Sequence, residues 1–174
     1  NAVFYPDALF SSLHSQYNGL FPLAVFALLF NKVIPVSSER IQKNIHRFAV
    51  LLCISILPSM FITFLWNRIN TVFLVISVIG SIILFLTFVW FLFSASLLSK
   101  EFKKVLPSIH YIVILSMSAF AIKTLLQSLT IFSSVNVLVF GNRPMIMGFL
   151  HLVFLGFVTL FLMAYFTQKG ILNS

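Results

Sequence analysis

Apolar runs long enough to cross a lipid bilayer recur along this chain of 174 residues. A helix needs about 20 apolar residues to span the hydrocarbon core. Five stretches are of about that length, and they cover residues 8–31, 48–66, 71–98, 105–132 and 144–167. They lack the alternation of polar and apolar side chains that membrane barrels require. Because backbone groups in lipid need internal partners, the sequence predicts an all-α integral membrane bundle of about five transmembrane helices in a single domain.

The charged residues give this bundle an expected orientation. The net charge is +8, and most of the basic residues lie in two short segments between apolar runs or in the tail: Lys32, Arg40, Lys43, Arg47, Lys100, Lys103, Lys104 and Lys169. Such an asymmetry follows the positive-inside rule, so it indicates a contact with the bilayer and not with nucleic acid. We therefore expect the N-terminus outside and the C-terminus inside.

Other sequence features exclude some classes of protein. The single cysteine, Cys53, lies inside an apolar run, so the chain forms no internal disulfide and has no cysteine-based metal motif. No paired acids, phosphate-binding loop or zinc-protease motif is present, so hydrolytic chemistry lacks support and the enzyme class stays open. The chain begins with Asn1 and shows no signal peptide, and we expect a processed product or a piece of a longer protein.

Three ionisable side chains fall at one depth in the outer half of the expected bundle. At about 1.5 Å per residue, His14, Lys123 and His151 lie about 9 to 12 Å below the outer boundary. Ionisable groups at such a depth usually face a bundle interior or a water-filled cavity, and they are candidates for a functional site. Purely structural readings also apply, because a histidine can bond a neighbouring helix and the lysine can snorkel toward the interface.

Polar neighbours extend this candidate site. Tyr17 and Asn18 lie three and four residues after His14, and Gln127 lies four residues after Lys123, so each shares a helix face with the ionisable group. Arg143 lies at the outer mouth, where it serves as an interface anchor or pairs with an anionic group.

The same segments carry a resemblance to a known family. The stretches "LHSQYNGLFPLAVFALLF", "AIKTLLQSL" and "GNRPMIMGFLHLVFLGFVTLFLMAYF" resemble the C-terminal half of a bacterial family of multi-span membrane proteins. That family is distantly similar to subunit I of the haem-copper oxidases. The resemblance implies an N-terminal half that this chain lacks, and a bacterial inner membrane as the location. It also implies a set of site residues, which are His14, Gln16, Tyr17, Asn18, Gly19, Lys123, Gln127, Arg143, Pro144, Gly148, His151 and Gly156. Ser15 and Leu20 depart from the family pattern, which has aromatic residues at both positions.

With this resemblance, our first hypothesis is a haem- or metal-binding redox protein of the membrane. An oxidase needs more histidine ligands than this chain provides at one depth, whereas one haem with two imidazole ligands needs only His14 and His151. Copper is a possible metal. In this hypothesis Tyr17 and Asn18 surround the ligands, and Lys123 with Gln127 handles protons or a haem propionate.

Two other hypotheses remain open. The polar cluster can line a path for a solute in a transporter or channel component, although the inner half of the helices offers few polar side chains. Alternatively, the chain is a structural or assembly subunit whose polar residues fasten it to other membrane subunits or to the missing N-terminal half.

Overall fold

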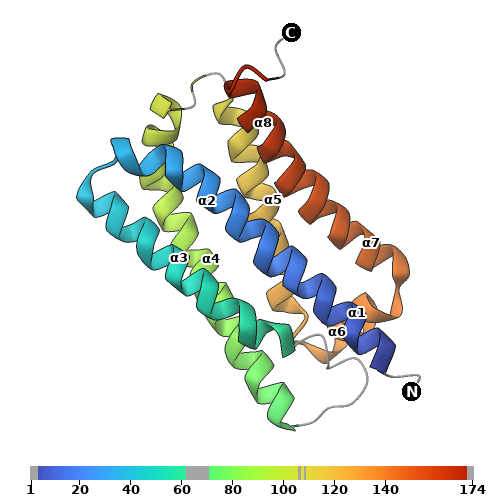
Figure 1. Cartoon of the computed structure of the whole chain (residues 1–174). Coiled ribbons are helices and arrows are strands. Elements are labelled where there is room, and N and C mark those ends of the chain that lie inside the picture. Colours follow the sequence, from blue (N-terminus) through green and yellow to red (C-terminus); the bar gives the residue numbers. More distant parts are fainter. Residues whose placement is uncertain (1–3, 62–70, 106, 108, 172–174) are drawn as a thin grey trace.

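A computed structural model of the chain describes residues 4–61, 71–105, 107 and 109–171, and every element in these residues is helical, as predicted. Long helices lie side by side and form one bundle (Figure 1). In chain order they are α1 (Phe4–His14), η1 (Ser15–Leu20), α2 (Phe21–Val33), η2 (Ile34–Val36), α3 (Glu39–Met60), α4 (Thr71–Val105), α5 (His110–Leu129), α6 (Ser133–Gly141), α7 (Arg143–His151), η4 (Leu152–Thr159) and α8 (Leu160–Gln168).

Four helical segments of the described chain are long and apolar enough to cross a membrane. They are Ser11–Val36, Thr71–Ser94, His110–Leu129 and Arg143–Gln168, and they match four of the predicted spans. The remaining predicted span, 48–66, begins within α3, which ends at Met60, and its last residues lie outside the described part. The fifth crossing and the orientation of the bundle stay predictions.

Two segments that lie between predicted spans are helical. The basic segment 99–104 belongs to α4, which runs for 35 residues. Lysine, glutamate and leucine favour helix, and 35 residues extend about 52 Å, so the basic end projects beyond a hydrocarbon core of about 30 Å. Residues 133–141 form the short helix α6 at one end of the bundle. The expected start of the last span is confirmed, because α7 begins at Arg143 and Pro144 lies in its first turn. Asn142 occupies the N-cap position, but its side chain donates to the carbonyl of Leu138 and makes no capping bond.

Phenylalanine rings fill the centre of the bundle. Phe26 of α2 is buried and lies within 6 Å, between ring centroids, of rings from α2, α3, α4, α5 and η4, namely Phe30, Phe48, Phe91, Phe120 and Phe157. Tilted and edge-to-face pairs of this kind add stability beyond the burial of their area. The cluster packs α2, α5 and η4 together, and these elements continue into the walls of the candidate site.

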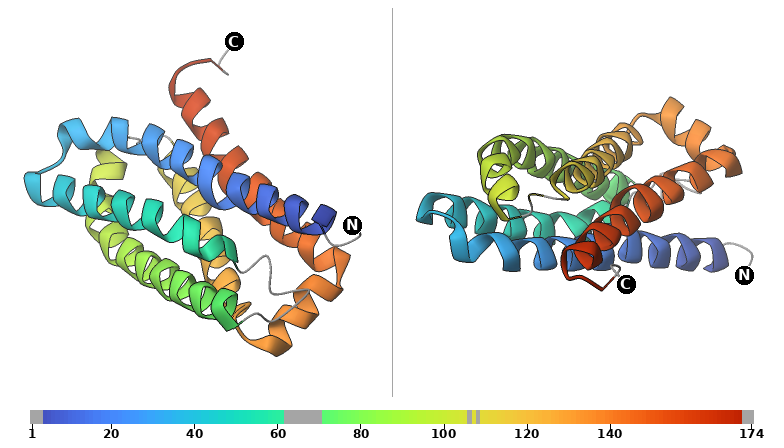
Figure 2. Two further views of the ribbon diagram at one scale, coloured as in Figure 1. Left: turned by 60° about the horizontal axis from the view of Figure 1, so that its bottom comes forward. Right: turned by 90° about the horizontal axis from the view of Figure 1, so that it is seen from above.

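Helices α3 and α4 run side by side in both views (Figures 1 and 2). Gly80 of α4 faces the backbone of α3, and a Cβ atom at this position would lie 2.4 Å from the carbonyl carbon of Pro58 and the nitrogen of Ser59. Small residues at such a crossing let two backbones approach closely, which is a common way to pack helices in lipid. The close approach also places Ser59 at the edge of the candidate site.

Two π-helical segments interrupt the long helices, and each begins directly after one of the two singled-out histidines. Segment η1 follows His14 and segment η4 follows His151. π-helical turns are rare and occur frequently at functional sites. Each segment contains a glycine that packs against another helix, since Gly19 faces Ile56 and an added Cβ at Gly156 would lie 3.1 Å from that of Ala119.

A serine of α5 supports the second π-helical segment. Ser116 donates a hydrogen bond of 2.7 Å to the main-chain carbonyl of Phe157. The carbonyl of Phe157 lies within η4, so this bond joins α5 directly to the π-helical segment. Interhelical bonds from serine hydroxyls of this kind help to hold helices together in lipid.

We expect Ser116→Ala to lower the free energy of unfolding by about 1 kcal/mol, since it removes a buried interhelical bond. The matched control is Ser118→Ala on the same helix, because Ser118 is exposed and bonds only to carbonyls of α5 itself. Unfolding in mixed micelles with increasing denaturing detergent, followed by circular dichroism, measures both. Equal effects of the two substitutions would contradict a role for Ser116 in holding η4.

Candidate functional site

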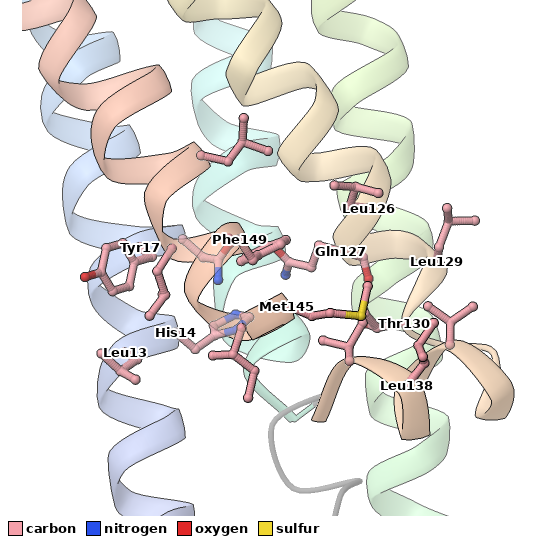
Figure 3. A pocket seen from close by; sticks show the side chains of 17 residues that line it. Leu13, His14, Tyr17, Leu126, Gln127, Leu129, Thr130, Leu138, Met145 and Phe149 are labelled. Carbon is pink, nitrogen blue, oxygen red and sulfur yellow. The ribbon is translucent and has the colours of Figure 1, made fainter. Parts of the chain in front are cut away.

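A cavity of about 440 Å³ lies between α1 with η1, α5, α6 and α7 (Figure 3). Most of its wall is apolar, with Leu13, Leu126, Val135, Ile146 and Phe149 among the lining residues. A few polar side chains converge on it, which are His14, Tyr17, Asn18, Gln127 and Thr130. Pockets of this size, mostly apolar with a few placed polar groups, are typical of sites for small molecules and cofactors.

His14 is the imidazole of this cavity. It is 8% exposed, and its Nε2 lies 3.1 Å from the Oγ of Ser59 on α3. The Oγ of Ser59 also lies 3.0 Å from the carbonyl of Ile56, and when the hydroxyl donates to this carbonyl, Nε2–H of His14 is the donor to Ser59. In that tautomer the lone pair of Nδ1 is an acceptor or a metal ligand.

Lys123 lies beside this histidine and is almost fully buried. Only 2% of it is exposed, so it does not snorkel, and its ammonium donates to Oδ1 of Asn18 on η1. Its Nζ also lies 5.8 Å from the centre of the Phe120 ring. No ion pair joins Lys123 to an acidic side chain of the described residues. A cation in this setting is costly to keep, and it is retained for specificity or function more readily than for stability.

Gln127 lies one helical turn after Lys123 and lines the cavity. It is 5% exposed, and neither its Oε1 nor its Nε2 has a hydrogen-bond partner in the described part of the protein. Figure 3 shows the side chains of His14 and Gln127 on opposite walls, from α1 and α5. A buried amide normally satisfies its polar atoms, so this one marks a place for a bound molecule or water.

The structure thus brings together five of the predicted site residues, which are His14, Tyr17, Asn18, Lys123 and Gln127. Tyr17 is half-buried at the cavity wall, with its ring 5.7 Å from that of Phe21. His151 and Arg143 lie apart from this group. Both are exposed on α7, and neither lines the cavity.

This arrangement bears on the predicted cofactor. A haem ligated by both histidines needs two imidazoles that face one space, whereas His14 points into the bundle and His151 lies on the outer surface of α7. No group of three or more histidine, cysteine or acidic side chains in the described residues is placed to hold a metal ion. The described residues therefore do not fit a haem held by His14 and His151 together, and haem, copper and metal binding stay predictions.

Sequence reasoning missed two parts of the site. Ser59 binds His14 across 45 positions of sequence, and no helical spacing within one span can pair them. The wall formed by α6 was also missed, because the segment 133–141 lies between two predicted spans. Its sequence, SSVNVLVFG, consists mostly of residues with low helix propensity and gave no local signal for a helix.

Comparisons with known proteins add no relative. No family model matches the sequence, and no curated protein or solved structure matches it either. The resemblance to the membrane family related to haem-copper oxidase subunit I is therefore an expectation from three sequence segments alone.

Proposed function

We propose that this chain is an integral membrane protein that binds an amphipathic small molecule or prosthetic group in the cavity between α1, α5, α6 and α7. The observation that carries the proposal is Gln127, a buried amide without a described partner at the wall of an apolar cavity. An apolar body fits the leucine, valine and phenylalanine side chains of the wall. A polar head fits the amides of Gln127 and Asn18 and the Nδ1 atom of His14.

The predicted haem- or metal-binding redox role is one form of this proposal. It is supported by the free nitrogen of His14 and by the π-helical segment that follows it. His14 is the histidine that would ligate such a group, with the other ligand supplied from outside the described arrangement. Bound there, the group would supply electron transfer, while the chain would orient it and exclude water.

A second candidate is a structural or assembly subunit, and the position of His151 favours it. This imidazole is exposed in the middle of a 26-residue apolar segment, where lipid offers it no hydrogen-bond partner. A neighbouring subunit that covers α7 would supply one. No comparable feature of the described residues favours the transporter or channel hypothesis.

We also propose that α3 is the fifth crossing, with the N-terminus outside and a bacterial inner membrane as the location. Support comes from the packing of α3 along the whole length that it shares with α4, and from the basic residues at the connection between α2 and α3 and at the end of α4.

The substitution Gln127→Leu tests the binding proposal. Because it replaces an unpartnered amide with an apolar side chain of similar size, we expect stability to be unchanged or raised, and retention of the bound molecule to fall about tenfold. The control is Gln16→Leu, since Gln16 is exposed on η1. The measurement is solvent extraction and mass spectrometry of the purified protein, with oxidised and reduced visible spectra and metal analysis of the same sample.

Two outcomes decide the test. A molecule or chromophore that is present in wild type and in Gln16→Leu, and depleted in Gln127→Leu, supports the proposal. Extracts of all three proteins that contain only bulk membrane lipid, with no chromophore and no metal, overturn it.

A further inference from the structure

Lys123 of the candidate site has no acidic partner among the described side chains. The whole chain has three acidic residues, and Glu39 begins α3, at the other end of that helix from Ser59 and the site. Lys123 is buried among α5, η1 and the phenylalanine core, with Asn18 as its hydrogen-bond acceptor. A neutral amide compensates only part of the cost of burying an ammonium group.

Asn18 lies between Lys123 and the cavity. Its Oδ1 accepts from the ammonium, and the amide N–H groups on the same side chain remain as donors. Asn18 lines the cavity, whereas Lys123 lies behind it. Gln127, on the same face of α5 as Lys123, adds a second amide whose N–H groups have no described partner. Donors near a buried cation form a site for an anion.

We infer that the molecule bound in this cavity carries a carboxylate, which the amides of Asn18 and Gln127 bind next to Lys123, with an apolar chain or ring against the remaining wall. This inference rests on the binding function proposed above. The carboxylate and the ammonium favour each other, because each charge lowers the cost of burying the other. A neutral head group gains the hydrogen bonds but not the charge pairing.

Photoaffinity labelling tests this preference at the cavity itself. The probes are a diazirine-bearing hexadecanoic acid and the matching diazirine-bearing hexadecanol, added at pH 7 to the protein in phosphatidylcholine nanodiscs. Tandem mass spectrometry compares labelling at Phe149, which lines the cavity, with labelling at Leu155, which is exposed on the outer face of the same long helix. Leu155 reports the unspecific contact of each probe with the protein surface.

In wild type we expect the acid to label Phe149 about tenfold more than the alcohol, after normalisation to Leu155. Lys123→Met should remove this preference and leave alcohol labelling in place, because it removes the charge and keeps an apolar side chain of similar length. Lys103→Met is the control, since Lys103 is exposed at the basic end of α4. It should keep the wild-type preference.

The outcomes separate this inference from the binding function. Equal labelling of Phe149 by acid and alcohol in wild type, or a preference that survives in Lys123→Met, overturns the carboxylate and leaves a neutral ligand. Labelling of Phe149 that never exceeds that of Leu155 with either probe contradicts the binding function as well. A Soret band in the purified protein assigns the carboxylate to a haem propionate, and its absence assigns it to a fatty-acid-like molecule.

Discussion

Replacing Gly80 by alanine is expected to destabilise the protein by about 3 kcal/mol, toward the upper end of the cost of overpacking. The added Cβ would lie 2.4 Å from two backbone atoms of α3, at Pro58 and Ser59. Backbone atoms cannot rotate away as a flexible side chain can, so α3 and α4 must separate. The shift also displaces Ser59, and with it the hydroxyl that orients His14. Detergent-induced unfolding followed by circular dichroism measures the loss.

The matched control for this prediction is Gly141→Ala. An added Cβ at Gly141 has no atom within 4 Å, and its backbone does not have a positive φ. Alanine in this helical position should be neutral or slightly stabilising, because alanine favours helix over glycine. A stability of Gly80→Ala equal to that of Gly141→Ala would show that α3 and α4 do not approach as described.

Replacing Gly148 by leucine is expected to empty the cavity of its ligand. Gly148 lines the cavity, and an added Cβ meets no atom within 4 Å, so a leucine side chain has room to enter the space without displacing a helix. A filled cavity no longer holds the apolar body of a ligand, and we expect the retained molecule to fall by about two orders of magnitude. Extraction and mass spectrometry of the purified protein measure the change.

Gly141→Leu is the control for the filled cavity. It makes the same substitution at a second glycine with open space around it, and Gly141 is not a cavity residue. Both variants should unfold at the same detergent concentration as wild type within about 1 kcal/mol, which separates loss of binding from loss of fold. Full retention of the ligand in Gly148→Leu would place the binding site elsewhere.

Much of the fold could be predicted from hydrophobicity and length alone, because a helix is the solution that lipid allows for a long apolar run. This reasoning placed four of the spans within a few residues of the apolar helical segments in the structure. The prediction was wrong where helix α4 continues beyond its apolar residues. The basic segment 99–104 follows helix propensity and not hydropathy, so it continues α4 where a loop was expected.

The candidate site was predictable only in part. The estimated depth along each span grouped His14 with Lys123. In the structure Asn18, four residues after His14, accepts a hydrogen bond from Lys123. Depth does not give the rotation of a helix about its axis, so it could not show that His151 faces outward. The partner of His14, Ser59, depends on the approach of α3 to α4 at Gly80, which is a property of two helices packed together and not of either sequence segment.

The most direct test of the central claim is native mass spectrometry of the wild-type protein released gently from detergent micelles. The account predicts one additional mass per chain, of a size that fits a cavity of about 440 Å³, and its loss in Gly148→Leu under identical conditions. A wild-type chain that appears at its bare mass, while surface lipids remain attached to it, would contradict a ligand in the cavity and leave the cluster of His14, Asn18, Lys123 and Gln127 as a contact between helices.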